Sequence, residues 1–222
     1  MPTALIIGAS RGIGREFVRQ LLAKEWQVYA TARDDAALTA LRAEGAEPIK
    51  LDVAIPESLA GLSWQLDGVK LDLAVYVAGV YGPSHGATSP PTAQDFSKVM
   101  HINVLGAMQV IPLVAPMVEA AQGKFVFISS EMGSIGTVPS SAGWVYRASK
   151  AALNMTVKSA SFEYPKAVMV AMCPGWVRTD MGGQNATLSV EESVSGLLRV
   201  IDTLDKSDSG TYCNHEGRVL AW

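Results

Sequence analysis

Tyr146 and Lys150 are the two residues of this sequence whose types and spacing point most directly to chemistry. On a helix, positions four apart share one face, so the tyrosine hydroxyl and the lysine ammonium would point into one pocket. A free tyrosine titrates near pH ~10, and a neighbouring cation favours the phenolate and lowers that value. Tyr146 is therefore a candidate general acid/base. The alternative is that the two side chains are an ordinary packing pair.

A glycine-rich segment, Gly8-Ala9-Ser10-Arg11-Gly12-Ile13-Gly14, follows an apolar run and opens an amphipathic stretch. Glycines allow a tight turn and the close approach of a ligand, and a helix amino terminus offers unpaired N–H groups to a pyrophosphate. The order Gly-x-x-x-Gly-x-Gly differs from Gly-x-Gly-x-x-Gly, so the inference depends on its position between a strand and a helix. We expect a dinucleotide to bind here.

The end of the second expected strand indicates which dinucleotide is bound. An NAD site usually has a carboxylate there for the ribose 2′-hydroxyl, whereas this chain has Ala32 and then Arg33, with Arg11 available from the glycine-rich turn. Two guanidinium groups near one ribose favour a 2′-phosphate, and hence NADP. The alternative is that both arginines are solvated and Asp34 binds the hydroxyl of NAD. Asp52, after the third expected strand, is placed to hydrogen-bond an adenine amino group.

The composition is that of a soluble α/β enzyme. The 222 residues fit one domain, 1–222, and are 49% hydrophobic and 18% charged, with a net charge of −3. That charge gives no electrostatic footprint for nucleic acid, and no cluster of Lys or Arg indicates an anionic membrane surface. Small molecules are the expected partners.

Metal-binding spacing is not found among the histidines and cysteines. Cys173 and Cys213 are far apart in apolar surroundings, and we expect both to be buried thiols. His85, His101 and His215 have no ligand spacing either, so we expect no metal site.

The start of the chain and its longest apolar run bear on localisation. Residues 1–3 lead directly into a strand without the features of a signal peptide, which predicts a cytoplasmic protein. The run Val104 to Val118 contains Gln109, Pro112 and Pro116 and falls short of the ~18 residues that span a bilayer. We expect a buried helix rather than a membrane segment.

Apolar β-rich runs alternate with helix-period stretches, which predicts parallel strands joined by crossover helices. Strands are expected at 4–7, 27–32, 48–51, 71–78, 124–129, 168–172 and 211–213. Helices are expected at 12–24, 34–43, 56–62, 93–121 with a bend near Pro112, 144–161, and 190–204 with Ser189 as its cap. Residues 79–91 and 130–143 are expected to be loops.

Taken together, the sequence motifs of this chain resemble those of the short-chain dehydrogenase/reductase family. The residues that carry the resemblance are Gly8 to Gly14, Asn103, Ser129-Ser130, Tyr146-x-x-x-Lys150 and Pro174-Gly175. Residues 130–136, the run 173–181 and the ending at Trp222 are similar to the C-factor and sniffer-type carbonyl reductase subgroup.

The resemblance implies a Rossmann-like, doubly wound parallel sheet of about seven strands in a three-layer sandwich. It also implies a nicotinamide cofactor and reversible hydride transfer between a carbonyl and an alcohol. Tyr146 would exchange the proton, Lys150 would lower the pKa of Tyr146 and bind the nicotinamide ribose, and Ser130 would bind the substrate oxygen. Asn103 would support a water and proton path to Lys150.

The same resemblance implies the cofactor-binding residues of the single domain. They are Gly8, Ser10, Arg11, Gly12, Ile13, Gly14, Arg33, Asp52, Val53, Ala78, Gly79, Tyr146, Lys150, Pro174, Gly175, Val177 and Thr179. Trp144, Trp176 and Met181 flank the expected pocket, where they contact substrate or simply pack.

Three positions depart from the family pattern. Ile7 stands where many members have Thr, and Tyr76-Val77 replaces Asn-Asn before Ala78-Gly79. The interval between Ser130 and Tyr146 is longer than usual, so Ser134 is an alternative to Ser130 as the substrate-binding serine.

Two functions are open on this evidence. The first is an NADP-dependent oxidoreductase acting on a small carbonyl or secondary alcohol, and the second is a nucleotide-binding sensor or signalling protein of the C-factor type without turnover. The helices at 93–121 and 144–161 could pair two copies into a homodimer or homotetramer.

Overall fold

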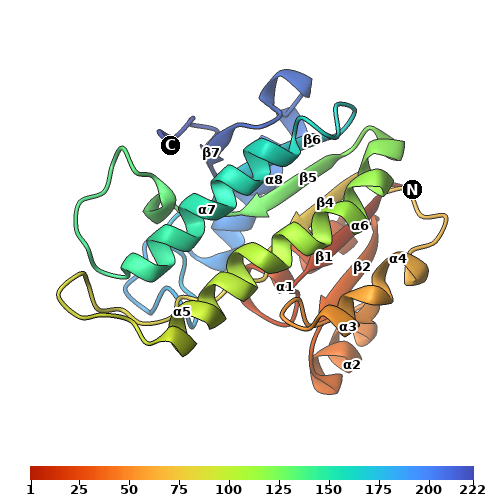
Figure 1. Ribbon diagram of the computed structural model, residues 1–222. Coiled ribbons are helices and arrows are strands. Elements are labelled where there is room, and N and C mark those ends of the chain that lie inside the picture. Colours follow the sequence, from red (N-terminus) through yellow and green to blue (C-terminus); the bar gives the residue numbers. More distant parts are fainter.

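Short segments rich in Val, Ile, Ala and Leu form the strands of one sheet, and the longer amphipathic segments between them form helices. The computed structural model describes all residues from 1 to 222 (Figure 1). The strands are β1 (Thr3–Ile7), β2 (Gln27–Ala32), β3 (Glu47–Lys50), β4 (Leu73–Tyr76), β5 (Lys124–Ile128), β6 (Val168–Cys173) and β7 (Tyr212–Asn214).

The sheet has the order β3-β2-β1-β4-β5-β6-β7, and every neighbouring pair is parallel. Ala4 of β1 is in register with Val28 of β2 on one side and Leu73 of β4 on the other. The strand order reverses between β1 and β4, and ligands of such sheets bind outside the carboxyl ends of the strands at that point. The expected doubly wound sheet of about seven strands is confirmed.

Helices cover both faces of the sheet. They are α1 (Gly12–Ala23), α2 (Asp35–Ala43), α3 (Pro56–Ala60), α4 (Leu62–Gln65), α5 (Ala93–Met100), α6 (Gly106–Ala121), α7 (Trp144–Ala160) and α8 (Val190–Thr203). Figure 1 shows α6 and α7 side by side in front of the sheet and α8 behind it.

Alternate residues of the strands enter two separate cores. Leu5 and Ile7 of β1 pack with side chains of α3, α4, α6 and α7, whereas Ala4 and Ile6 pack with those of α1, α2 and α8. Successive side chains of a strand point to opposite faces, so a central strand covered on both sides must be apolar throughout. All five residues of β1 are accordingly buried.

The helix expected at 93–121 is interrupted, though not where it was expected. A π-helical segment at His101–Leu105 separates α5 from α6, while Pro112 and Pro116 lie inside α6. π-Helical turns are often found at functional sites, and this one contains Asn103. The whole stretch Ala93–Ala121 is 29 residues long and, by length and composition alone, apolar enough to cross a membrane. Its inner face packs on the sheet, as the core helix of a globular fold does.

Other helix and strand boundaries differ slightly from expectation. The helix expected at 56–62 is two short helices that meet at Gly61, a residue with low helix propensity. The strand expected at 71–78 is confined to the four residues of β4. Ser189 caps α8 as expected, and Glu192 completes a reciprocal capping box.

Candidate active site

The parallel sheet brings most of the predicted site residues together at the carboxyl ends of its strands. Each of five strands is followed at its carboxyl end by such residues: Gly8 after β1, Arg33 after β2, Asp52-Val53 after β3, Ala78-Gly79 after β4, and Ser130 after β5. Pro174-Gly175 follows β6 in the same way. The sequence therefore places these groups together because all seven strands run in the same direction.

The glycine-rich turn packs so closely against its neighbours that a side chain would not fit at Gly8 or Gly14. A Cβ atom on Gly8 would lie 2.8 Å from the backbone nitrogen of Ala78, and one on Gly14 would lie 2.1 Å from the Gly8 carbonyl oxygen. Gly8 also has a φ of +93°, a region that side chains disfavour. The turn is thus held against the end of β4 and against its own helix.

Helix α1 begins in this turn with its amino terminus open. No side chain caps it, since Arg11 occupies the cap position without a capping hydrogen bond, whereas Asp34 caps α2. The first N–H groups of a helix lack intrahelical partners and carry a partial positive charge. This end of α1 can therefore receive a phosphate group.

Thr31 supplies a hydroxyl group that the turn lacks at Ile7. The Gly8 amide donates to Thr31 Oγ1 at 3.0 Å, and the Ala9 amide donates to the Thr31 carbonyl oxygen at 2.8 Å. These bonds tie the turn to β2, two residues before Arg33. Arg33 is exposed and makes no ion pair.

Tyr76 occupies the place of the first asparagine of the family pattern. It is buried, and its hydroxyl donates to the carbonyl oxygen of Ile102 at 2.7 Å, within the π-helical segment. A Cβ atom on Gly106 would lie 2.6 Å from the same hydroxyl and 3.1 Å from Cβ of Val53. The packing at this point thus joins β4, the end of β3 and α6.

Asp52 accepts from the Ala54 amide through Oδ1 at 3.0 Å, and its Oδ2 has no protein donor.

Asn103 ties the loop after β4 to α7. It is fully buried, and its Nδ2 donates to the Val80 carbonyl and to Ser149 Oγ, both at 2.9 Å. Its Oδ1 accepts from the Val80 amide at 2.8 Å. The amide side chain therefore fixes the backbone directly beyond Gly79.

Lys150, Tyr146 and Ser130 meet above the end of β5. Lys150 is buried, its Nζ donates to the Ile128 carbonyl at 2.8 Å, and it lies 5.6 Å from the centre of the Tyr146 ring. Burial raises the pKa of the Tyr146 phenol, and the neighbouring Ser130 hydroxyl opposes that rise. Ser134 is buried as well, but its hydroxyl has no hydrogen-bond partner. Of the two serines, only Ser130 influences the pKa of Tyr146.

The electrostatics of the pair differ from the expectation that Lys150 lowers the pKa of Tyr146. Burial is the largest influence on Tyr146 and raises the pKa of its phenol, with Ser130 opposing. Burial also lowers the pKa of Lys150 to about 8. The phenol is therefore protonated at neutral pH, and Lys150 carries its charge only below about pH 8.

The segment after β6 is held by several side chains. Ser193 Oγ donates to the Pro174 carbonyl at 2.7 Å, and Gly175 has a φ of +80°. Thr179 Oγ1 accepts from the Gly182 amide at 3.1 Å, and its methyl group would lie 3.4 Å from a Cβ on Gly12. Val177 is buried. The loop therefore closes on the glycine-rich turn.

Two residues at the site were missed from the sequence. The Tyr81 ring packs against the Tyr146 ring in a tilted arrangement, with ring centres 4.8 Å apart. A signal for it existed in its position two residues after Gly79. Cys173 is a buried free thiol, as expected, but its Sγ also accepts from the amides of Glu131 at 3.1 Å and Gly175 at 3.4 Å. It thus joins the loops after β5 and β6, a contact that spacing alone does not reveal.

Comparison with known proteins identifies the family. The short chain dehydrogenase family model matches residues 2–188, so the chain belongs to this family of oxidoreductases, as expected. It is 40% identical over 131 residues to C-signal of Myxococcus xanthus, covering 58% of this chain and 79% of that protein.

Solved structures of carbonyl reductases are also similar to this chain. An NADPH-bound carbonyl reductase from chicken fatty liver is 34% identical with a TM-score of 0.90, and the carbonyl reductase Sniffer of D. melanogaster is 26% identical with a TM-score of 0.91. Both comparisons cover the whole of this chain, with 99% of the chicken structure and 100% of Sniffer. The expected similarity to C-factor and sniffer-type carbonyl reductases is confirmed.

Proposed function

We propose that this protein is an NADP-dependent reductase of small carbonyl compounds that also catalyses the reverse oxidation of secondary alcohols. The observation that carries the proposal is the convergence of Ser130, Tyr146 and Lys150 beside Gly79, at the sheet edge where α1 presents an uncapped amino terminus. A proton donor and a dinucleotide-binding turn are thereby adjacent.

The residues at this edge fit NADP. The open end of α1, with Gly8, Ser10, Gly12, Ile13 and Gly14, would receive the pyrophosphate. Arg11 and Arg33 would bind the 2′-phosphate, and Asp52 and Val53 the adenine. The remaining predicted contacts, to the nicotinamide and its ribose, are Ala78, Gly79, Tyr146, Lys150, Pro174, Gly175, Val177 and Thr179. The similarity to an NADPH-bound carbonyl reductase supports this assignment over NAD.

The protein side chains would manage the proton while the bound cofactor supplies the hydride. Ser130 donates a hydrogen bond to the carbonyl oxygen, where negative charge develops as the carbon is reduced. Tyr146, whose pKa is raised by burial, then transfers its proton to that oxygen and an alcohol results. Lys150 holds a positive charge beside the phenolate that remains. Asn103 keeps the loop at Val80 in place and supports a proton path to Lys150.

Two measurements test the proposal. Fluorescence titration with NADPH and NADH should show binding, tighter for NADPH, and a panel of aldehydes, quinones and ketones should reveal turnover. Tyr146→Phe should retain NADPH binding and lose turnover, whereas Tyr29→Phe, which removes a phenol hydroxyl from β2, should retain both. Absence of binding to either cofactor would contradict the proposal.

The partial match to C-signal keeps the sensor function as the second candidate. It predicts tight NADPH binding without turnover of any member of the panel. The presence of Asn103, Ser130, Tyr146 and Lys150 together favours the enzyme.

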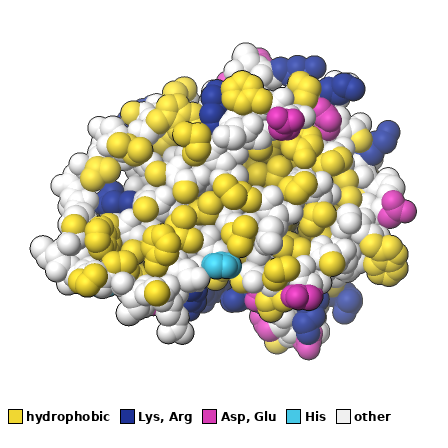
Figure 2. Space-filling model, in the orientation of Figure 1, with side chains coloured by type: hydrophobic (Ala, Val, Ile, Leu, Met, Phe, Trp, Pro, Cys, Tyr) yellow, Lys and Arg dark blue, Asp and Glu magenta, His cyan; other side chains and the backbone are white.

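We further propose that the single domain, 1–222, holds both sites and forms a homodimer or homotetramer. Figure 2 shows hydrophobic side chains gathered over α6 and α7, with charged groups at the rim. Met108 of α6 and Met155 of α7 are at least 50% exposed. Leu105, directly before α6, is 39% exposed, and Phe162, after α7, is 73% exposed. Light scattering of the protein and of Met108→Glu tests this face, and the variant should dissociate.

We propose a cytoplasmic location, with neither nucleic acid nor membrane as partner.

A further inference from the structure

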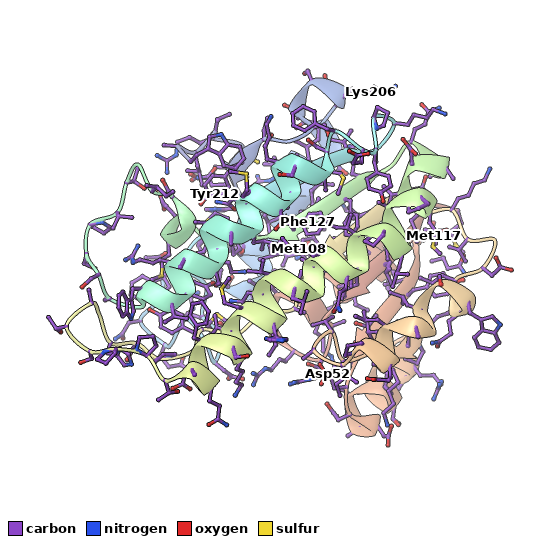
Figure 3. The ribbon with its side chains drawn as sticks, in the orientation of Figure 1. Asp52, Met108, Met117, Phe127, Lys206 and Tyr212 are labelled. Carbon is purple, nitrogen blue, oxygen red and sulfur yellow. The ribbon has the colours of Figure 1, made fainter.

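Tyr212 of β7 lies directly behind the candidate substrate-binding serine. It is 1% exposed, and its hydroxyl donates a 2.5 Å hydrogen bond to the carbonyl oxygen of Ser130. In Figure 3 Tyr212 is seen at the flank of α7 that faces β7. We propose that Tyr212 is a positioning residue that holds Ser130 in the orientation required to bind the substrate oxygen. This inference rests on the carbonyl reduction proposed above.

The Ser130 peptide unit sets the direction of the Ser130 hydroxyl. Its carbonyl oxygen also accepts from the Gly133 amide at 2.8 Å, and its Oγ accepts from the Met132 amide at 3.2 Å. Both bonds belong to the short 3₁₀ turn Glu131–Gly133. Tyr212 binds the same carbonyl from outside this turn. The peptide plane is then held from two directions, which fixes the backbone that carries the hydroxyl. Rotation of the hydroxyl itself would break its hydrogen bond from the Met132 amide.

Helix α7 supports the turn from the other side. A Cβ atom on Gly133 would lie 2.8 Å from the backbone carbon of Lys150, so the turn rests on the helix at that residue. Ser129 Oγ donates to Oδ1 of Asn154 at 2.6 Å. Tyr146, Lys150 and Asn154 are spaced four apart and share one helix face. The face that carries the reactive pair therefore also anchors the residue before Ser130.

Trp222 fixes Tyr212 in turn. The two rings are stacked with centres 5.6 Å apart, and the Trp222 carbonyl oxygen accepts from the amides of Ile135 and Gly136, both at 2.9 Å. Trp222 thus contacts both Tyr212 and residues 135–136 of the loop that follows Ser130. The last strand and the segment after it consequently act on the site although none of their side chains belongs to the predicted catalytic set.

A role in packing alone makes different predictions from a positioning role. Ser130 acts where charge develops in the transition state, so a misdirected hydroxyl should lower kcat and leave KM for NADPH nearly unchanged. A loosened core would instead reduce the fraction of active protein whether or not Ser130 carries its hydroxyl. The distinction can be made by removing both hydroxyl groups in a double-mutant cycle.

The test uses Tyr212→Phe, which deletes the hydroxyl and keeps the ring. We expect kcat to fall about 10-fold, with KM for NADPH within about twofold of the wild-type value. In a Ser130→Ala background the same substitution should change kcat by less than about twofold, because its target is absent. Tyr29→Phe is the matched control and should leave kcat unchanged. An unaltered kcat in Tyr212→Phe, or an equal loss in both backgrounds, would overturn the proposal.

Hydrogen–deuterium exchange gives a readout that needs no turnover. The amides of residues 131–136 should exchange faster in Tyr212→Phe and at the wild-type rate in Tyr29→Phe. Unchanged exchange would refute the positioning role. A wild-type protein that reduces no carbonyl would defeat the proposed function, while the exchange result would still decide the role of Tyr212. Should Tyr212→Phe not fold, Trp222→Leu keeps the hydroxyl and should show the same pattern at smaller amplitude.

Discussion

Arg11 and Asp180 join the glycine-rich turn to the loop after β6, with Nη1 of the arginine 2.5 Å from Oδ2 of the aspartate. Both side chains are about three-quarters exposed, at 75% and 74%. Ion pairs in such surroundings contribute about 0–1 kcal/mol, so the arginine is free to exchange its partner for a more highly charged one. A 2′-phosphate is such a partner.

Arg11→Gln should therefore weaken NADPH binding about 10-fold and leave NADH binding within about twofold, since only NADPH carries the additional phosphate. Fluorescence titration of both cofactors measures the change. Arg15→Gln is the matched control, because Arg15 pairs with Glu44 instead. Equal weakening of NADPH and NADH would show that Arg11 contacts a part common to both.

Asp180→Asn should have the opposite effect. It removes the competing carboxylate from Arg11, so NADPH should bind as tightly as in the wild type or up to about threefold more tightly. Weaker NADPH binding would mean that the ion pair is needed to hold the loop, not merely exchanged.

The pH dependence of reduction should report Lys150. Burial lowers its pKa to about 8 in the free protein, so kcat/KM should be constant below that pH and fall as the ammonium loses its proton above it. A profile that is flat between pH 7 and 9.5 would contradict this assignment. Steady-state kinetics at saturating NADPH and varied carbonyl would measure it.

The same pKa has a consequence for stability. The folded-state pKa of about 8 lies below the ordinary lysine pKa of 10.5, so between these pH values the unfolded chain binds more protons than the folded one. The free energy of unfolding should therefore gain a rising contribution from pH 8 to 10.5. Below pH 8 the cost of burying the charge is fully present. Lys150→Met should remove this contribution from the slope in denaturant titrations.

The choice between two serines can be made by substitution. Ser130→Ala should lower kcat by about 10²–10³-fold, as loss of a transition-state hydrogen-bond donor does. Ser134→Ala should leave kcat within about threefold and should not lower the melting temperature, because its buried hydroxyl has no partner to lose. The reverse ranking would make Ser134 the substrate-binding residue.

Tyr76→Phe tests the packing that replaces the asparagine pair. It removes the 2.7 Å hydrogen bond to Ile102 and leaves that carbonyl with one partner fewer in a buried position. We expect the free energy of unfolding to fall by about 1–2 kcal/mol in urea titrations. A change below ~0.5 kcal/mol would indicate that the π-helical segment is held by its other contacts.

The order of strands and helices could be predicted from the sequence because hydrophobic periodicity is local. The alternation of apolar runs and amphipathic stretches indicated seven strands, and the cap at Ser189 was visible as a residue type at a helix start. The π-helical segment at His101–Leu105 was not visible. Its carbonyl at Ile102 bonds to Tyr76, a partner 26 residues away, so neighbouring residues do not encode it.

The sequence by itself determined which groups could react: the Tyr146 and Lys150 spacing, the glycine-rich turn and the serines after β5. Only the tertiary structure decided how they are held. Burial rather than Lys150 dominates the pKa of the Tyr146 phenol, and Ser130 rather than Ser134 opposes its effect. The supports at Thr31 and Tyr212 come from strands that are distant in the chain. Residue spacing is a local property of the sequence. Desolvation and hydrogen bonding depend instead on contacts between residues that are distant in the sequence and become neighbours only in the folded chain.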